Sequence, residues 1–551
     1  MRRTQAAASP VMLGTLELAR QCSVLLAAAA AILVLGQSPA AALAQRGGMS
    51  GGESRQRRGI SYLADREFAK ALDEFRAAIQ LDPENAAAHD YAGVALAELG
   101  RPDDAAAEFR RAIQVSDGLS SAHFHLALAY DRMGRALDAI QQYEATLRVD
   151  PAFVEAKYAL SAACWKLGDR SGAIQLLRQV VRLRPPFVAE AQINLGVELR
   201  EQGELEGAVR ELQAAAQLLP TLPRVYLALG QALADRQDFN AAIEALREAI
   251  KLAPDRAESH YNLAEVLRLK SDFDASKTEF EGALKLDSHY PEAHRQLGLA
   301  LRQQGHYEAA VAELREAVTQ DPNDADSHYY LGSALMKLGD AQGAIRHLTE
   351  AVRLNPYESA AHVALAKALQ GAGRSEDAAE HLKEAAKIDA LAANAGRSRV
   401  LLGSAKDHLH KGETGVALDE LRQAADLSPE YPEVQFQLAR ALKKNGAPPR
   451  EVVSALQRSI ALKPDYAEAN FELGLALEML GENANGLGEI RRSVELAPSL
   501  VEAHRVLGEA ALKAHDWSGA ISEFGAVLAW NETDQAARQK LAIAQSHLRN
   551  N

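Results

Sequence analysis

Apolar and small residues recur along the chain in a pattern that predicts pairs of short helices. Between Ala325 and Pro356, a first stripe with the spacing i, i+3, i+4, i+7 consists of His328, Leu331, Gly332 and Leu335. After the break at Gly339-Asp340, a second stripe consists of Ala344, Leu348, Ala351 and Leu354. Pro356 then ends the second helix, because proline lacks the backbone N–H that a helix interior uses. Since Gly332 and Ala344 are small, we expect the two helices to approach closely as a hairpin.

This hairpin repeats with a period of 34 residues. Successive prolines are separated by 34 or 35 residues, by 68, or once by 73; they are Pro83, Pro151, Pro185, Pro220, Pro254, Pro322, Pro356, Pro429, Pro464 and Pro498. Self-similarity at such a period indicates one supersecondary unit stacked many times. We count fourteen units, which begin at residues 52, 86, 120, 154, 189, 223, 257, 291, 325, 359, 398, 432, 467 and 501.

The repeated residues resemble the tetratricopeptide repeat. One matching unit contains His123, Leu126, Ala127, Tyr130, Ala139, Tyr143, Thr146 and Pro151, and another contains Gln192, Leu195, Gly196, Leu199, Ala208, Leu212, Ala215 and Pro220. The resemblance covers residues 52–534 and implies an all-α fold, a right-handed superhelical solenoid of stacked helical hairpins. It also implies that positions two, five, nine, twelve and thirteen of each first helix line the concave side.

Departures from the repeat predict the domain boundaries. We expect repeats 1–10 over residues 52–392 and repeats 11–14 over residues 398–534. Between them Ala390 replaces a proline and five residues, 393–397, are extra, so we expect an irregular junction or an extended helix. Residues 535–551 are predicted to form a capping helix and tail.

The first 44 residues have the features of a secretory signal peptide. Arg2 and Arg3 precede an apolar run from Val24 to Leu35 that is short for a membrane span, and small residues then end at Ala44. We expect cleavage after Ala44, a linker over residues 45–51, and a periplasmic or secreted mature chain without a transmembrane span. Retention of the segment as an uncleaved anchor is the alternative.

The net charge excludes one class of partner. The 551-residue chain has a net charge of -13, and loss of residues 1–44, with three arginines and one glutamate, makes it -15. Nucleic-acid binding requires a basic surface, so we expect no nucleic acid partner. Cys164 is the only cysteine after residue 44, which excludes an internal disulfide in the cleaved chain.

Histidine occupies the fourth position of seven units, at His89, His123, His260, His294, His328, His362 and His504. Such a row indicates either metal ligands or catalytic residues, or a packing contact that each unit repeats. Packed helices lie ~8 to 10 Å apart, whereas the ligands of one metal ion converge to about 2 Å from it. We therefore interpret the row as half-buried histidines that pack within each hairpin, and we expect no metal site and no cofactor.

The chain contains no Gly-rich phosphate loop, HExxH, paired cysteines or GxSxG, and no room outside the repeats for a catalytic domain. We therefore predict no catalytic residues and no enzymatic activity.

An apolar and aromatic track with basic residues beside it is predicted on the first helices. The candidate partner-binding residues are Tyr158, Arg200, Tyr261, Arg268, Arg302, Tyr329, Lys337, Lys367, Phe436, Arg440 and Lys443. They fit a groove for one or more proteins or peptides, in which arginine and lysine meet acidic side chains. The alternative is a row of solvated charges whose aliphatic stems cover leucines.

The sequence thus favours an exported, non-enzymatic scaffold that mediates protein–protein interactions. A second hypothesis, based on the aromatic track, is a carbohydrate-associated role in the assembly or export of an envelope polysaccharide.

Overall fold

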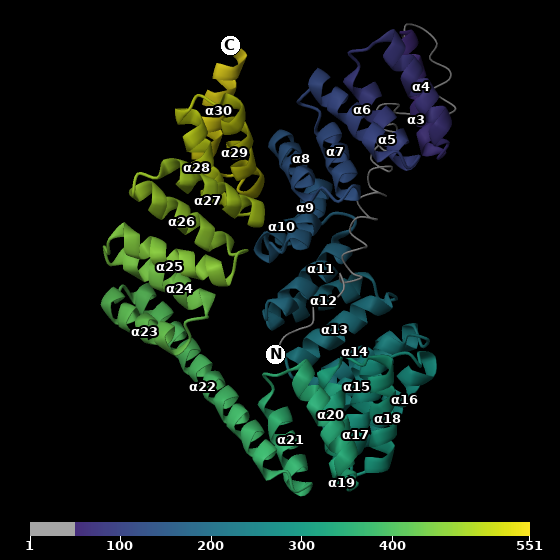
Figure 1. Cartoon of the computed structure of the whole chain (residues 1–551). Coiled ribbons are helices and arrows are strands. Elements are labelled where there is room, and N and C mark those ends of the chain that lie inside the picture. Colours follow the sequence, from purple (N-terminus) through teal and green to yellow (C-terminus); the bar gives the residue numbers. More distant parts are fainter. Residues whose placement is uncertain (1–49, 551) are drawn as a thin grey trace. The chain divides into compact units, whose positions relative to one another are not determined.

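The computed structural model describes residues 50–550, which form 28 helices and no strands (Figure 1). The all-α prediction is therefore confirmed for these residues. The predicted signal peptide, residues 1–44, and most of the predicted linker lie outside the described residues. Within residues 50–550, no helix combines the length and the apolar character that crossing a membrane requires.

The helices pair as stacked hairpins, and the chain divides into two compact units. The first unit consists of the residues up to Asn194 together with Leu442–Asn551, and the second unit is Leu195–Ala441. The helices of the first segment are α3 (Gly51–Ala64), α4 (Phe68–Leu81), α5 (Ala86–Glu98), α6 (Pro102–Val115), α7 (Ser120–Arg132), α8 (Ala136–Val149), α9 (Val154–Leu167) and α10 (Arg170–Leu183). The C-terminal segment contains α25 (Pro449–Leu462), α26 (Ala467–Met479), α27 (Asn483–Leu496), α28 (Val501–Lys513), α29 (Trp517–Trp530) and α30 (Gln535–Asn550).

The second unit contains α12 (Leu205–Leu218), α13 (Pro223–Asp235), α14 (Phe239–Leu252), α15 (Ala257–Leu269), α16 (Phe273–Leu286), α17 (Pro291–Gln303), α18 (Tyr307–Gln320), α19 (Ala325–Lys337), α20 (Ala341–Leu354), α21 (Ser359–Gly371), α22 (Ser375–Lys411) and α23 (Thr414–Leu427). Helices α11 (Val188–Glu201) and α24 (Pro432–Lys444) cross the two boundaries. The predicted repeat blocks, 52–392 and 398–534, stay a prediction.

Local chemistry explains each hairpin, as α19 and α20 show. Gly339 has φ +81° and turns the chain between the two helices. Asp340 Oδ1 then accepts from the backbone N–H of Gly343 at 2.8 Å and caps α20. A Cβ at Gly332 would lie 2.6 Å from Leu348 Cγ, so the absence of a side chain allows the close approach predicted from the sequence.

The junction between repeats ten and eleven is one continuous helix. Helix α22 runs for 37 residues through positions 393–397, so the extended helix is the form found. Its middle lacks tertiary packing, since every residue from Ala386 to Arg397 is exposed or half-buried. Beyond the repeats, α30 lies where the capping helix was predicted.

The first helices of repeats three and four are buried on all sides. Every residue of α7 from Ala122 to Asp131 is buried, and α9 is buried from Ala156 to Cys164. In the second unit, by contrast, α15, α17 and α19 each keep one half-exposed face. A binding surface on first helices is therefore available in the second unit and not on α7 or α9.

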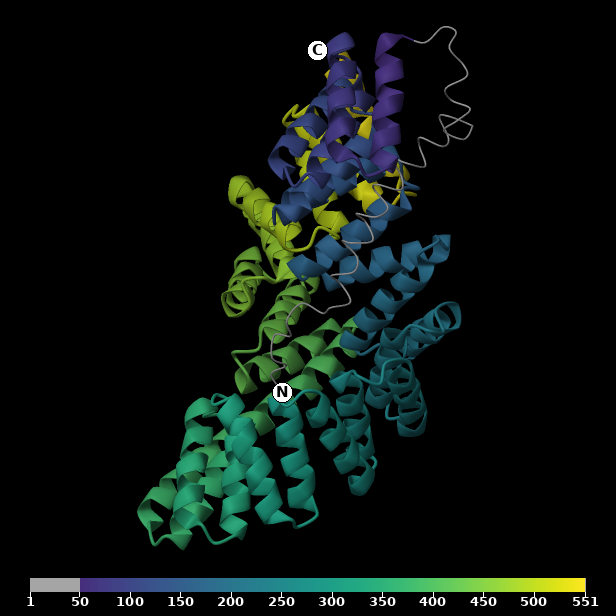
Figure 2. The same ribbon diagram turned by 90° about the vertical axis from the view of Figure 1, so that its right-hand side faces the viewer.

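Helices from opposite ends of the sequence pack together inside the first unit, where α8 contacts α29 (Figure 2). Trp530 is 2% exposed within the apolar cluster of the N-terminal repeats, and its Nε1 donates to Glu144 Oε1 at 2.9 Å. Asp169 accepts two hydrogen bonds from Ser499, through its backbone N–H and its hydroxyl. The first unit is therefore held together by contacts between residues more than 300 positions apart.

Candidate functional site

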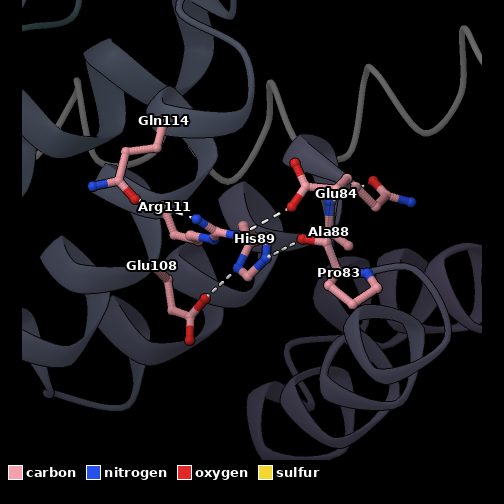
Figure 3. Close-up of polar contacts among 8 residues, drawn as sticks. Pro83, Glu84, Ala88, His89, Glu108, Arg111 and Gln114 are labelled. Carbon is pink, nitrogen blue, oxygen red and sulfur yellow. Dashed lines mark hydrogen bonds and ion pairs between the residues drawn. The ribbon is translucent and has the colours of Figure 1, made fainter.

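The histidine row is a structural feature of the hairpins, as Figure 3 shows for His89. His89 Nδ1 lies 2.7 Å from Glu108 Oε2 on the second helix, and Nε2 lies 3.2 Å from the carbonyl oxygen of Pro83 in the preceding turn. One ring thus joins three successive segments of a repeat. The proline recurs because it ends a helix, and the histidine recurs because the carbonyl six residues earlier needs a donor.

The same two contacts occur at all seven histidines. In each, Nε2 lies 3.0 to 3.4 Å from the carbonyl oxygen six residues earlier. Nδ1 faces the residue nineteen positions later, and these residues are Glu108, Gln142, Glu279, Glu313, His347, His381 and Glu523. The packing interpretation is supported, but the rings are deeper than expected, since five of them, including His328, are at most 7% exposed.

Three histidines in these contacts have a displaced pKa, namely His504, His347 and His381. Burial lowers the pKa of His504, but the hydrogen bond to Glu523 and the charge of Glu144 outweigh it, so the pKa is raised. In contrast, burial and the neighbouring His328 lower the pKa of His347 to about 4. Burial and His362 likewise lower the pKa of His381. His347 and His381 were not predicted from the sequence, although each occupies position 23 of its repeat unit.

The predicted groove residues are not equally accessible. Tyr158 and Phe436 are buried, at 3% and 6% exposed, and Tyr158 Oη accepts from Asn194 Nδ2 at 2.9 Å. Tyr261 and Tyr329 are half-buried, and Lys337, Lys367, Arg440 and Lys443 are exposed. The structure therefore leaves Tyr158 and Phe436 outside any accessible surface.

Three of the seven predicted cations are neutralised by ion pairs. Arg200 contacts Glu201 at 3.1 Å and Asp235 at 3.7 Å, Arg268 contacts Glu265 at 3.4 Å, and Lys443 contacts Glu472 at 2.7 Å. Arg440 lies over the Phe436 ring at 5.8 Å. Arg302, Lys337 and Lys367 form no ion pair with the described residues. Four predicted cations therefore have no acidic partner among the described residues: three on the neighbouring first helices α17, α19 and α21, and Arg440 on α24.

Aromatic side chains surround this charge. The Arg302 guanidinium lies 5.4 Å from the ring centroid of Tyr330, whose ring is 5.1 Å from that of Tyr329. On α15, Tyr261 stacks on Tyr290 with centroids 5.0 Å apart. Burial raises the pKa of both Tyr261 and Tyr330, so their phenols are neutral hydrogen-bond donors at physiological pH. Sequence reasoning missed Tyr290 and Tyr330, because they lie outside the positions assigned to the concave side.

We call this surface the first-helix face. It is formed by α15, α17, α19 and α21, which contact one another in order, and it consists of Tyr261, Arg268, Tyr290, Arg302, Tyr329, Tyr330, Lys337 and Lys367. Two of its polar atoms are buried without a hydrogen bond, Nε of Arg268 and Nε of Arg302. Oε1 of Gln296 between them is also unpaired. Because these three atoms are buried, they are not themselves part of the accessible surface.

Among the described residues, no group of three or more histidine, cysteine, aspartate or glutamate side chains is arranged to hold a metal ion. Cys164 is buried, and burial raises the pKa of its thiol well above its ordinary value. A buried thiol of this kind is unreactive.

Sequence models of one repeat family match most of the chain. Models described as tetratricopeptide repeat match residues 57–119, 124–186, 257–290, 335–399, 402–467 and 449–501, and a model described as TPR repeat matches 196–235, 230–270 and 298–339. No curated protein matches the chain.

Several solved structures resemble the chain. The APC/C hetero-tetramer Cut9-Hcn1 is 13% identical and covers 90% of this chain and 96% of that chain, with a TM-score of 0.35. MamA from Desulfovibrio magneticus RS-1 is 24% identical over 30% of this chain and 94% of that chain, with a TM-score of 0.29. YrrB, described as a TPR protein with an unusual peptide-binding site, is 21% identical over 34% of this chain and 95% of that chain, with a TM-score of 0.29. Because these TM-scores are low, the family assignment rests on the sequence models.

Proposed function

Since the chain belongs to the tetratricopeptide repeat family, we propose that it is an exported, non-enzymatic scaffold that binds a protein partner through the first-helix face. The observation that carries this proposal is the combination of free cations and half-buried aromatic rings on α15 to α21. Of the other first helices, α7 and α9 are buried, Arg200 and Lys443 already have an acidic partner, and Arg440 on α24 lies over the ring of Phe436, which is itself buried.

The partner that fits is an acidic peptide segment with apolar or aromatic side chains. Arg302, Lys337 and Lys367 supply positive charge without an internal counter-ion in a chain of net charge -13. Tyr329 and Tyr330 supply ring surface for apolar side chains, and aromatic residues with arginine are the usual energetic centres of interfaces.

Charge reversal on the face tests this proposal. The partner is first captured with the full chain from an envelope fraction and identified by mass spectrometry, and its affinity is then measured for Arg302→Glu and Lys337→Glu. The matched control is Lys285→Glu, an exposed lysine on α16, which is a second helix of its repeat. We expect each face variant to weaken binding at least tenfold and the control to bind as the parent does. Equal affinity of all variants would show that the partner binds elsewhere.

The N-terminal residue of the recovered protein tests the proposed export. N-terminal sequencing of the protein recovered from a periplasmic or secreted fraction should begin at Gln45. Recovery of an intact N-terminus would indicate an uncleaved anchor.

Carbohydrate binding is the competing role for the aromatic residues. Stacking on a sugar requires an open ring face, and Tyr261 and Tyr290 use one face each against each other. A peptide partner should dissociate as salt is raised, because its charges are screened. Glycan binding that is unchanged by salt and by Arg302→Glu would favour the carbohydrate role.

A further inference from the structure

Two consecutive repeats bring pairs of imidazole nitrogens together. His328 Nδ1 on α19 lies 3.2 Å from His347 Nδ1 on α20, and His362 Nδ1 on α21 lies 3.1 Å from His381 Nδ1 on α22. At the five other fourth-position histidines, the ring faces a glutamate or glutamine oxygen instead. The two pairs are therefore chemically unlike the rest of the histidine row.

The backbone fixes which nitrogen of the buried ring is free. Nε2 of His328 lies 3.2 Å from the carbonyl oxygen of Pro322, and Nε2 of His362 lies 3.2 Å from that of Pro356. A carbonyl only accepts, so each Nε2 carries the hydrogen and donates it. The Nδ1 atom of the neutral ring then has a lone pair directed at the second histidine. Metal-binding histidines are commonly held by this same donation to a carbonyl.

The separation of the two nitrogens suits a shared ion. Zinc binds imidazole nitrogen at about 2.0–2.1 Å in tetrahedral geometry, which places two such nitrogens about 3.3 Å apart. We propose that His328 with His347, and His362 with His381, form two binding sites for a divalent transition metal such as zinc. Imidazole is a ligand that zinc, copper and nickel accept, and water would complete each coordination shell.

The sites are reached from one side. His328 and His362 are buried at 7% and 5% exposed, whereas His347 and His381 are half-buried. Each site has only two protein ligands, so its affinity is below that of a four-ligand structural site. The spacing that excludes a metal shared between successive repeats does not apply here, because both ligands belong to one repeat.

Nearby charges differ between the two sites. The first pair lies near two arginines, Arg315 and Arg346, and two carboxylates, Asp340 and Glu350, whereas the second lies near Asp377 and Glu380. Since carboxylates attract a cation and guanidinium groups repel it, the His362 site should bind more tightly.

The test compares zinc uptake by the full chain, without an affinity tag, with uptake by the variant His347→Gln/His381→Gln. Glutamine is the residue found opposite His123, where Nδ1 and Gln142 Oε1 are 2.8 Å apart, so the variant keeps the hairpin contact and the other 14 of the 16 histidines. Glutamine lacks the carboxylate by which glutamate binds zinc. After equilibrium dialysis against zinc chloride, the metal content of each protein is measured, and circular dichroism confirms that each is folded.

We expect the parent to hold two more zinc ions per chain than the double variant, and one more than either single variant. At limiting zinc, His381→Gln should lose more metal than His347→Gln. Conversely, Glu313→His should add one ion by creating a third pair at His294. Equal zinc content in the parent and the double variant would overturn the proposal and identify the pairs as N–H···N hydrogen bonds.

Discussion

Removal of the Trp530 side chain should loosen helices at the opposite end of the sequence. The indole is 2% exposed, lies in the apolar cluster of the N-terminal repeats and donates to Glu144. Its backbone carbonyl accepts from Gln175 Nε2 on α10 at 3.0 Å. Trp530→Ala therefore removes the largest apolar group in the contact between α8 and α29.

The expected loss can be worked from burial and hydrogen bonding. Replacing a buried tryptophan by alanine costs about 3–5 kcal/mol. Glu144 is 8% exposed and loses a donor, and an unsatisfied buried acceptor costs about 1–3 kcal/mol more. Because the two terms share one site they do not simply add, and we expect a loss of about 4 kcal/mol or more in the unfolding free energy of the first unit.

Hydrogen exchange read by mass spectrometry locates the loss. Protection should fall in α29 and also in α8, whose residue Glu144 lies 386 positions from Trp530. The control is Trp517→Ala, since Trp517 is half-buried and stacks on His547 of α30 with centroids 4.3 Å apart. That change should raise exchange in the last hairpin and leave α8 as protected as in the parent.

A second variant, Glu144→Gln, removes the charge of the carboxylate but keeps an acceptor for the Trp530 hydrogen bond. Burial raises the pKa of Glu144, so the protonated carboxyl group contributes stability below pH ~4.5 that is lost as the pH rises through the folded-state value. Glu144→Gln keeps an acceptor for Trp530 and should unfold at the same or a higher temperature than the parent at neutral pH. If Trp530→Ala raises hydrogen exchange only in α28 to α30, each hairpin is stabilised by its neighbours in sequence alone. The contact between α8 and α29 would then not stabilise α8, contrary to this prediction.

Four further substitutions and one proteolysis experiment test the hairpins and helix α22. Gly332→Ala should cost about 1–3 kcal/mol, because its Cβ would meet the paired helix at 2.6 Å, whereas Gly396→Ala in open space on α22 should gain about 0.5–1 kcal/mol; thermal unfolding measures both. Leu331→Asp should cost several kcal/mol by burying a charge, and His328→Ala about 1–3 kcal/mol by leaving a carbonyl unpaired, so equal losses in urea unfolding would contradict this order. Trypsin should cut first near Arg397 in the unpacked middle of α22, and a first cut inside a packed hairpin would contradict the weakness of that helix.

The sequence by itself determined the helices and their pairing. Residues such as Leu331 and Leu348 follow the helical period, and Gly339 and Pro356 mark turns, so the hairpin of α19 and α20 could be predicted. These features depend on neighbours a few residues away or on the adjacent helix. For the same reason the histidine row could be interpreted as packing.

The candidate site was predicted only in part. Tyr261, Tyr329, Arg302, Lys337 and Lys367 lie together on accessible first helices as expected. The repeat pattern gives every unit the same geometry, so it could not show that α9 is buried on all sides while α15 is not. Nor could it show which cations are neutralised, because those partners lie on other helices or at positions that the repeat leaves variable.

Only the tertiary structure decided how distant repeats meet. Each hairpin is rotated slightly against the next, and this rotation depends on side-chain fit rather than on the repeated pattern. Summed over many repeats, small differences in rotation decide whether Trp530 reaches Glu144 or stays in water. The contacts within a hairpin could therefore be predicted from the sequence, whereas the burial of Tyr158 and the packing of α29 against α8 could not.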